Sequence, residues 1–289
     1  MTARSYLYVP GDSGERLERS TSRGADAVIA DLEDAVAAAR RPAARTAIAA
    51  WLTSDQVEGQ RWVRINAGPE GLKDLDAVHS VHLSGVVVPK VRRVDDLEPV
   101  AEALALLDRS QGNAGRGVAL MVLVETAGAL RDVHAIAEHP AVRMLQMGEL
   151  DLAAELGIQP SNDGSELSYA RSHVVMASAA AGLDPPVGAV SPDFKNLEGY
   201  RSSCERLRRL GFFARAAIHP AQIPVIHRVF TPSAAEVEAA RRTLSRYEAE
   251  VSAGSAVLTD TDGSMVDEAV VRASRRTLAL ARTLTRARC

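Results

Sequence analysis

The sequence has few cysteines, few aromatic residues and little net charge. Among its 289 residues are 2 cysteines and 4% aromatic residues, and the formal net charge is -3. Cys204 and Cys289 cannot assemble a disulfide framework or a thiolate zinc site, so we expect a protein of the reducing cytoplasm. The near balance of 34 basic and 37 acidic residues argues against nucleic acid and membrane partners.

Long apolar runs are also missing. The N-terminal apolar stretch, Tyr6 to Val9, stops at Pro10 before it reaches the length of the hydrophobic region of a signal peptide. No apolar run approaches the ~20 residues that a membrane-spanning helix needs. We therefore predict a soluble protein that is not exported, with 46% hydrophobic residues to form a sizeable core.

The chain does contain a repeated alternation of short apolar runs with longer segments of helical spacing. The predicted strands are Ser5–Val9, Ala27–Asp31, Trp62–Ile65, Gly85–Pro89, Val118–Glu125, Val142–Met147, Pro186–Val190 and Ala214–Ile218. The predicted helices between them are Arg16–Arg23, Pro42–Trp51, Leu72–Val81, Asp95–Leu107, Ala127–Ala137, Ser165–Ala181, Leu197–Leu210 and Gln222–Val229. Eight such units favour a closed (β/α)8 barrel over residues 1–230 rather than an open doubly wound sheet, which needs only five or six strands.

Residues 231–289 are predicted to form a helical extension. Ser233–Val251 is typical of a helix with Ser233 as N-cap and Glu236 in the capping-box position. A second helix is predicted at Glu268–Arg286. The segment between them, Gly254–Met265, is rich in Ser, Thr, Asp and Gly, which is the composition of a mobile loop.

Polar residues follow most of the predicted strands, where the active site of such a barrel lies. They are Asp31, Glu33, Asp34, Arg64, Asn66, Lys90, Glu125, Glu149, Asp151, His219 and Gln222. Carboxylates that converge without a His/Cys cluster suit a hard divalent cation that keeps several waters, which predicts Mg2+. Glu125 and Asp151 are the natural ligand pair, and Arg64 could stabilise an enolate or alkoxide beside them.

Each of these residues also has a structural interpretation. Glu125 and Asp151 could be the first-turn acids of helices. Arg64 could pair with the acids that follow the second strand, and those acids could form a solvated rim. Lys90 could be a surface lysine and His219 a core-edge histidine. The other six histidines include no i, i+4 pair, which argues against a histidine-based metal site.

Several motifs occur in order from Arg4 to about residue 270. They are Arg4–Gly11 (RSYLYVPG), Gly24–Val36 (GADAVIADLEDAV), Val63–Asn66 (VRIN), Val88–Lys90 (VPK), Leu123–Ala127 (LVETA) and Ala217–Pro224 (AIHPAQIP). Together they resemble the citrate lyase beta-subunit-like proteins of the HpcH/HpaI aldolase superfamily. The resemblance implies a (β/α)8 barrel that makes or breaks carbon–carbon bonds in 3-hydroxyacyl-CoA thioesters with Mg2+.

By this resemblance, Glu125 and Asp151 are metal ligands and Arg64 holds the oxygen of the keto acid. Further candidates are Glu33 and Lys90 for the substrate and Arg16, Lys90 and His219 for coenzyme A. Asp267, in Met265-Val266-Asp267, matches an aspartate that related lyases and malate synthases carry on a C-terminal lid. Such a lid often comes from a neighbouring subunit, which implies a homotrimer or a dimer of trimers. From sequence alone, Asp267 is a helix N-cap.

One position departs from the family pattern. The family commonly has Gly-Ala-Glu-Asp-Leu where this chain has Gly148-Glu149-Leu150-Asp151-Leu152, so Leu150 replaces a usual glutamate. This change affects the polar surroundings of the metal and the preference for substrate. Glu149 could compensate from the neighbouring position if its side chain points differently.

These observations predict a retro-Claisen lyase. It would cleave a malyl- or citramalyl-type CoA ester to an α-keto acid and acetyl-CoA, and Asp267 would give the enolate its proton. Three alternatives remain: a citrate lyase beta subunit acting on citryl-acyl-carrier-protein, a malyl-CoA thioesterase or malate-synthase-like enzyme, and a non-catalytic binding or regulatory protein.

Overall fold

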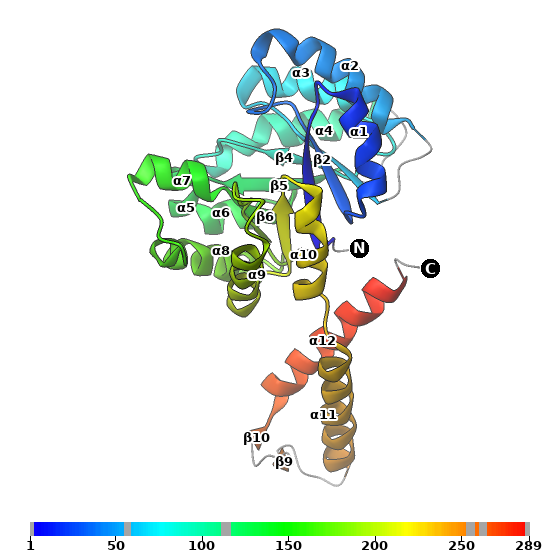
Figure 1. Ribbon diagram of the computed structural model, residues 1–289, viewed down its shortest axis with the longest axis vertical. Helices are drawn as coiled ribbons and strands as arrows, with labels where there is room; N and C mark the ends of the chain where they lie inside the picture. Colours follow the sequence, from blue (N-terminus) through cyan, green and yellow to red (C-terminus); the bar gives the residue numbers. More distant parts are fainter. Residues whose placement is uncertain (1–2, 55–58, 111–116, 253–257, 260–264, 287–289) are drawn as a thin grey trace. The chain divides into compact units, whose positions relative to one another are not determined.

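Eight parallel strands close into a barrel in the order β1 to β8 (Figure 1). The structure, a computed structural model, describes residues 3–54, 59–110, 117–252, 258–259 and 265–286. The strands are β1 Ser5–Pro10, β2 Ala27–Asp31, β3 Gln60–Arg64, β4 Gly85–Val88, β5 Ala119–Val124, β6 Val142–Met147, β7 Val187–Gly188 and β8 Ala214–Ala217. The predicted (β/α)8 barrel is confirmed.

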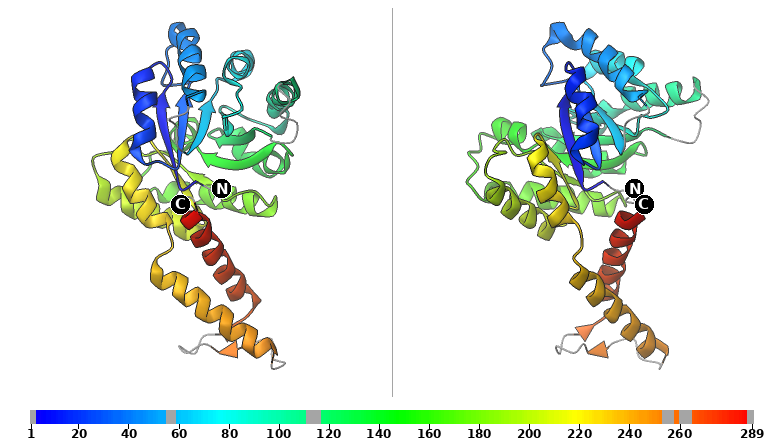
Figure 2. Two further views of the ribbon diagram at one scale, coloured as in Figure 1. Left: turned by 90° about the vertical axis from the view of Figure 1, so that its right-hand side faces the viewer. Right: turned by 45° about the vertical axis from the view of Figure 1, so that its right-hand side comes forward.

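Helices cover the outside of the barrel in both views of Figure 2. They are α1 Gly14–Ser20, α2 Arg41–Leu52, α3 Gly68–Val78, α4 Glu98–Ser110, α5 Ala127–Arg131, α6 Val133–Glu138, α7 Glu149–Leu156, α8 Ser168–Ala180, α9 Leu197–Leu210 and α10 Ile223–Phe230. Short 3-10 turns occur at Thr21–Arg23, Ala38–Arg40, Val94–Leu97, Ser165–Leu167 and Pro220–Gln222. The longer helices bury one face, as α4 does with Val100 and Leu104.

Several elements have other bounds than predicted, such as α3, and three differ in kind. The helix predicted at Ala127–Ala137 is two helices, because Asp132 adopts φ -98 and ψ 14 between them. The strand predicted at Pro186–Val190 pairs only through β7, since Pro186 has no N–H to donate. Helix α7 was not among the predicted return helices, because its eight residues bury only Leu152 and Ala153 and show no clear period.

The barrel interior is filled toward the N-terminal ends of the strands. Tyr6 and Trp62 pack edge to face with their ring centroids 5.9 Å apart. Gly85 leaves room for this packing, because a Cβ there would lie 2.1 Å from Cζ3 of Trp62. Small side chains such as Ala27 and Ala214 complete the same buried cluster. Cavities at the other end of the barrel are therefore bounded below by a packed core.

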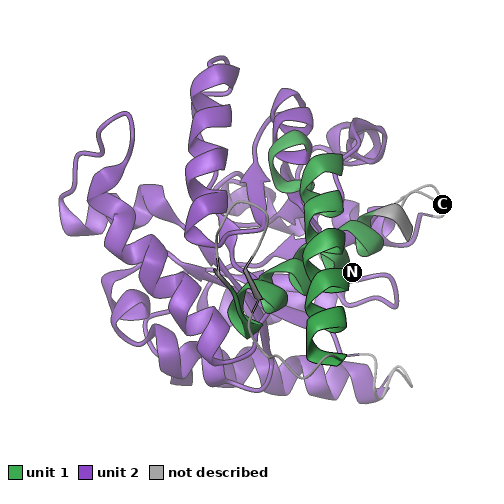
Figure 3. Ribbon diagram, turned by 90° about the horizontal axis from the view of Figure 1, so that it is seen from below, with its two compact units in different colours: residues 1–2, 228–289 green, residues 3–227 purple. Residues whose placement is uncertain are grey.

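The chain divides into two compact units, one of Ala3–His227 and one that contains residues 228–289 (Figure 3). The sequence had placed the boundary at residue 230, and α10 spans this region. No helix in the described part of the chain is long and apolar enough to span a membrane.

The second unit is built on two helices, α11 Ala234–Ser252 and α12 Glu268–Arg286. The predicted capping box is present, since the Ser233 N–H donates to Glu236 Oε2 at 2.7 Å and the Glu236 N–H donates to Ser233 Oγ at 3.2 Å. Val266 and Val271 form its small core with Leu244 and Tyr247.

A short antiparallel ladder joins these helices. It pairs β9, Leu258–Thr259, with β10, Met265–Val266. The predicted mobile loop, Gly254–Met265, therefore contains strand residues at 258, 259 and 265. The remainder of that predicted loop lies outside the described residues.

Candidate active site

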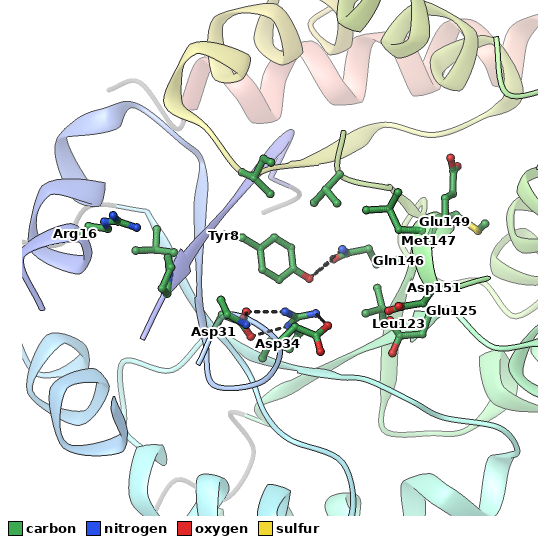
Figure 4. A pocket seen from close by; sticks show the side chains of 18 residues that line it. Tyr8, Arg16, Asp31, Asp34, Leu123, Glu125, Gln146, Met147, Glu149 and Asp151 are labelled. Atoms are coloured by element: carbon green, nitrogen blue, oxygen red, sulfur yellow. Dashed lines mark hydrogen bonds and ion pairs between the residues drawn. The ribbon is translucent and has the colours of Figure 1, made fainter. Parts of the chain in front are cut away.

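A cavity of about 490 Å³ opens at the C-terminal ends of the barrel strands (Figure 4). Its lining comes from the ends of β1, β2, β3, β5 and β6, from the loops after β2, β5, β6, β7 and β8, and from the helices α1 and α7. The residues are Tyr8, Val9, Pro10, Arg16, Asp31, Asp34, Ala35, Arg64, Leu123, Glu125, Gln146, Met147, Gly148, Glu149, Leu150, Asp151, Val190 and Ile218. The cavity therefore brings together Arg64, Glu125 and Asp151, as predicted from their places at strand ends.

Arg64 is held in a fixed orientation by Asp31. The two residues are register partners on β3 and β2. Arg64 Nε donates to Asp31 Oδ1 at 2.7 Å, and Nη2 donates to Oδ2 at 2.6 Å. Burial alone would lower the pKa of Arg64, but the hydrogen bonds with Asp31 raise it, so the guanidinium stays charged. The predicted structural pairing of Arg64 thus exists, and it places the guanidinium at the cavity wall.

Glu33 and Asp34 add to the acidic surroundings of Arg64. Arg64 Nη1 lies 2.8 Å from Glu33 Oε2 and 3.4 Å from Asp34 Oδ2. The Glu33 contact lacks hydrogen-bond geometry, so this buried oxygen has no hydrogen-bond donor. Burial raises the pKa of Glu33 to about 7, although Arg64 opposes the shift. Asp34 remains exposed, whereas Asp31 and Glu33 are buried, so only part of this run is a solvated rim.

Glu125 and Asp151 lie side by side on the same wall of the cavity (Figure 4). Glu125 follows β5 and is 1% exposed. Burial raises its pKa to about 8, against the opposing effect of Lys90. Asp151 lies in the first turn of α7, and its pKa is lowered because the hydrogen bond from Lys90 outweighs burial. Thr126, rather than Glu125, caps the helix that follows β5.

Lys90 contacts three of these acids at once. Its N–H donates to Glu125 Oε1 at 2.7 Å, and its Nζ donates to Asp151 Oδ2 at 2.7 Å. The same Nζ lies 3.4 Å from Glu125 Oε1 and 3.7 Å from Glu33 Oε1. Burial would lower the pKa of Lys90, but Asp151 and the neighbouring acids raise it. Lys90 is therefore not a surface lysine that extends into solvent.

Gly148 makes room for Glu125. A Cβ at position 148 would lie 2.4 Å from Glu125 Cβ and 3.1 Å from Glu125 Oε2. Both neighbours of such a methyl group are fixed, because Glu125 is buried at the end of a barrel strand. Glycine at position 148 is therefore required by close packing against the carboxylate.

Tyr8 and Gln146 are polar cavity residues that the sequence did not single out. They hydrogen-bond each other between Tyr8 Oη and the Gln146 amide, at 3.2 Å from Oε1 and 3.0 Å from Nε2 (Figure 4). The Arg64 guanidinium lies over the Tyr8 ring, 5.2 Å from its centroid. Burial raises the pKa of Tyr8, so the phenol stays neutral. Gln146 could have been found as the one neutral polar residue of its strand, whose other polar residue, Arg143, is exposed.

The departure at position 150 places an apolar side chain on the cavity wall. Leu150 is 54% exposed although it lines the cavity. Glu149 lines the same cavity, and Arg171 binds its carboxylate through Nε and Nη2, each at 2.7 Å. The suggestion that Glu149 compensates for Leu150 stays a prediction.

A second cavity of about 360 Å³ contains Arg16 and His219. It shares Tyr8, Val9, Pro10, Arg16 and Ile218 with the first cavity, and its other lining residues are Leu7, Arg19, Ser20, Arg23, His219 and Pro220. Arg19 and Arg23 were not predicted as binding residues. Their spacing from Arg16, three and seven residues along the chain, places the three on one helical face and could have indicated them.

His219 and Gln222 order the loop after β8. The Ala221 N–H donates to His219 Nδ1 at 3.1 Å, and the His219 ring stacks on Phe194 with centroids 4.7 Å apart. Gln222 is fully buried; its Oε1 accepts from the N–H groups of Ile218 and His219 at 2.9 and 3.1 Å. The His219 ring is exposed at the barrel mouth, rather than at the edge of the core.

Asp267 caps α12 in the second unit. Its Oδ1 accepts from the N–H groups of Ala269 and Val270 at 2.9 and 3.1 Å. This is the N-cap geometry that the sequence indicated as the structural alternative. The lid role of Asp267 remains a prediction.

The acids at the barrel mouth fit a hard divalent cation. Within the described residues, no group of three or more His, Cys, Asp or Glu side chains is arranged to hold a metal ion. Glu125 and Asp151 supply two adjacent carboxylates, and Mg2+ commonly uses one or two while it retains water. The ammonium of Lys90 beside both carboxylates shows that this position attracts positive charge.

The fold and the cavity define a (β/α)8-barrel protein whose acidic residues gather at the C-terminal ends of the strands. The family model described as HpcH/HpaI aldolase/citrate lyase matches residues 4–220, and the chain belongs to this family. Within the family it is a citrate lyase beta-subunit-like protein, as its motifs predicted.

Three related proteins illustrate its similarities. The (3S)-malyl-CoA thioesterase of Cereibacter sphaeroides is 35% identical over 284 residues, covering 97% of this chain and 95% of that protein. The citrate lyase beta subunit of Escherichia coli is 29% identical over 285 residues, covering 97% and 93%. A crystal structure of the CitE protein of Mycobacterium tuberculosis, in complex with magnesium, acetoacetate and coenzyme A, matches with a TM-score of 0.76 and 29% identity, covering 96% of this chain and 97% of that chain.

Proposed function

We propose that the protein is a Mg2+-dependent carbon–carbon lyase. It cleaves a 3-hydroxyacyl-CoA ester of malyl or citramalyl type into an α-keto acid and acetyl-CoA. The main support is the cavity that contains the anchored Arg64 together with the carboxylates of Glu125 and Asp151. The related CitE structure holds magnesium, a small keto acid and coenzyme A, which agrees with this combination.

Glu125 and Asp151 would hold the metal, and Arg64 would bind the substrate oxygen beside it. When bound, Mg2+ supplies positive charge that stabilises negative charge on the substrate oxygens. Asp31 holds the Arg64 guanidinium in place, so Arg64 meets the developing charge without reorganising. Tyr8 and Gln146 add neutral hydrogen-bonding groups that orient the substrate in the same cavity.

As the carbon–carbon bond breaks, the 3-hydroxyl group gives up its proton to solvent and becomes the carbonyl of the keto acid, while the electron pair of the broken bond passes to the acetyl thioester. The resulting enolate carbon must receive a proton, and Asp267 supplies it from the second unit. In the condensing direction the same carboxylate removes that proton. Replacement of Asp267 by Asn should strongly reduce turnover and leave Mg2+ binding unchanged, and normal turnover would exclude Asp267 from the reaction.

Coenzyme A would lie in the second cavity. Arg16, Arg19 and Arg23 line that cavity and provide positive charge for phosphate groups. The two cavities share Tyr8 and Arg16, so a thioester can run from one into the other. His219 lines the same cavity, and its ring, which stacks on Phe194, could extend that stack to the adenine ring of coenzyme A.

A coupled assay tests this function. The purified full chain is incubated with Mg2+ and malyl-, citramalyl- or citryl-CoA, and both the keto acid and acetyl-CoA are measured. We expect equal amounts of both products from one substrate, with loss of activity in EDTA and in Glu125→Ala. If the protein binds Mg2+ but forms neither product from any of the three esters, a free CoA ester is not its substrate.

Thioester hydrolysis is the second candidate, because a relative with 35% identity is named a malyl-CoA thioesterase. A thiol reagent distinguishes the two reactions. Release of free CoA with malate, and without keto acid, would establish hydrolysis. Acetyl-CoA with no free thiol would establish lyase action.

The citrate lyase alternative needs a different carrier. A beta subunit of that enzyme would act on a citryl-acyl-carrier-protein together with partner subunits. Activity of the isolated chain on free CoA esters would count against it. We also expect the purified protein to be a homotrimer or a dimer of trimers, which sedimentation equilibrium can measure.

A further inference from the structure

Lys90 has the most unusual position of the charged residues at the barrel mouth. It is the one non-glycine residue with a positive φ, 55°, in the described part of the chain. Its ammonium lies within 3.7 Å of carboxylate oxygens from Glu33, Glu125 and Asp151. We propose that this ammonium competes with a divalent cation for Glu125 and Asp151, so that Lys90 sets the metal affinity of the site. The proposal rests on the metal site of the proposed function.

The left-handed conformation of Lys90 explains how one residue makes these contacts. Its N–H donates to Glu125 Oε1 at 2.7 Å, while Nζ reaches Asp151 Oδ2 at 2.7 Å. The main chain and the side chain therefore both point toward the acids. A lysine pays a conformational cost in this region of φ, and such strain is concentrated at functional sites. The main-chain N–H of Lys90 positions the Glu125 carboxylate, whereas its ammonium neutralises part of the negative charge of Glu125 and Asp151.

Geometry makes simultaneous binding unfavourable. Mg2+ binds carboxylate oxygens at ~2.1 Å. An ion bound to Asp151 Oδ2 would lie at most about 5 Å from Nζ, because Nζ is 2.7 Å from that oxygen. The ammonium also lies 3.4 Å from Glu125 Oε1, the second proposed ligand. Mg2+ must therefore displace the ammonium or bind against its repulsion, and either event weakens metal binding.

The two contacts of Lys90 can be separated by substitution. Lys90→Met keeps an unbranched side chain that is one atom shorter and removes its charge. Lys90→Gly keeps the N–H donor, suits a positive φ and also removes the charge. Lys73→Met is the matched control, because Lys73 is an exposed lysine on α3 that pairs with Glu70 outside the cavity.

Isothermal titration of the full chain with MgCl2 at fixed pH and ionic strength tests the competition. We expect Lys90→Met and Lys90→Gly each to bind Mg2+ at least about tenfold more tightly than the wild type, while Lys73→Met binds as the wild type does. Unchanged or weaker binding in both Lys90 variants would overturn the proposal. If Lys90→Met does not fold, Lys90→Gly alone decides, since glycine relieves the backbone strain.

Thermal unfolding provides a second measurement. Without the ammonium, Mg2+ becomes the main counter-charge of the acids, so the rise in Tm from EDTA to saturating Mg2+ should be larger in Lys90→Met than in the wild type. An equal rise would contradict competition. Neither measurement uses a substrate, so an inactive lyase assay with tighter metal binding would reject the lyase and leave the role of Lys90 intact.

Discussion

Individual residues fix the carboxylates of the candidate site, and Gly148 does so by having no side chain. The Cβ of an alanine there would lie 2.4 Å from Glu125 Cβ, well below any normal contact. Rotation of the Glu125 side chain does not move its Cβ, so relief of this clash must shift the main chain of Glu125 and its carboxylate with it. The position of one proposed metal ligand therefore depends on the absence of a side chain at position 148.

We predict that Gly148→Ala weakens Mg2+ binding at least about tenfold. A tenfold loss corresponds to ~1.4 kcal/mol of binding free energy, and a clash of this size costs at least that much when it displaces a ligand. The barrel should still fold. Calorimetry with Mg2+ and circular dichroism measure the two effects. Gly14→Ala is the control, since a Cβ at Gly14 meets nothing within 4 Å, and it should bind Mg2+ normally. Wild-type affinity in Gly148→Ala would show that Glu125 is not a ligand.

The protonation of Glu125 leads to a second prediction. Burial raises its pKa to about 8, so the carboxyl is largely protonated at neutral pH and must lose that proton to bind a metal. Mg2+ affinity should therefore rise with pH, by up to about tenfold per unit below pH 8, and level off above it. Titrations in buffers of different ionisation enthalpy should show a proton released near pH 7. Affinity independent of pH from about 6 to 9 would contradict this assignment.

The sequence identified only some of the cavity residues. Arg64, Glu125 and Asp151 could be found because the C-terminal ends of all strands lie on the same face of a (β/α)8 barrel, so charged residues there lie close together. Tyr8 and Gln146 were missed because each lies within a predicted strand, whereas the candidate residues were sought where the strands end. Distances within the site depend on backbone conformations such as that of Lys90, which has no sequence signal of its own.

At the scale of elements, Gln222 joins the loops after β7 and β8. Its Oε1 accepts two N–H groups from residues 218 and 219, and its Nε2 donates to the carbonyl of Ser191 at 3.2 Å. Val190 and Ile218, on these two loops, both line the first cavity. One buried amide therefore holds two walls of the cavity together.

We predict that Gln222→Ala lowers the free energy of unfolding by about 1–3 kcal/mol, because it removes a buried side chain and leaves three partly buried main-chain groups without their partner. Urea unfolding followed by circular dichroism measures the change. His219→Ala is the comparison: it removes one exposed capping contact and should cost less, about 0.5–1 kcal/mol. A Gln222→Ala protein as stable as the wild type would show that other groups, or water, satisfy the loop.

The predicted helices agree best with the structure where the apolar spacing of a helix continues over the whole length of the element. The helix at Glu268–Arg286 has the predicted bounds, because its apolar spacing continues over nineteen residues. The single helix predicted at Ala127–Ala137 was wrong, since apolar spacing continues through Asp132 although the backbone breaks there. Helix α7 was missed because its eight residues are too few to show a helical spacing of apolar residues.

At the scale of the whole molecule, the chain forms two compact units, and the proposed proton donor belongs to the second. Asp267 caps α12, whereas every lining residue of both cavities belongs to Ala3–His227. The sequence predicts a barrel over residues 1–230 and a helical extension over residues 231–289 from their patterns.

Truncation after Phe230 should therefore preserve Mg2+ binding and abolish most of the lyase turnover. We predict that residues 1–230 keep the circular dichroism of a folded barrel and bind Mg2+ within about threefold of the full chain, because both proposed ligands lie in the barrel. Lyase turnover should fall to that of full-length Asp267→Asn. Circular dichroism, calorimetry and the coupled assay give the three readouts, and a truncated chain that turns over normally would exclude the second unit from the reaction.

The two neighbouring cavities attract ligands of opposite charge. Once Glu33 and Glu125 have lost their protons, the five carboxylates of Asp31, Glu33, Asp34, Glu125 and Asp151 exceed the cations Arg64 and Lys90 by three formal negative charges. Arg16, Arg19 and Arg23 line the other cavity and are positive. A divalent cation is therefore drawn to the carboxylates, whereas the phosphate groups of an anionic carrier are drawn to the arginines. Added salt should slow both encounters.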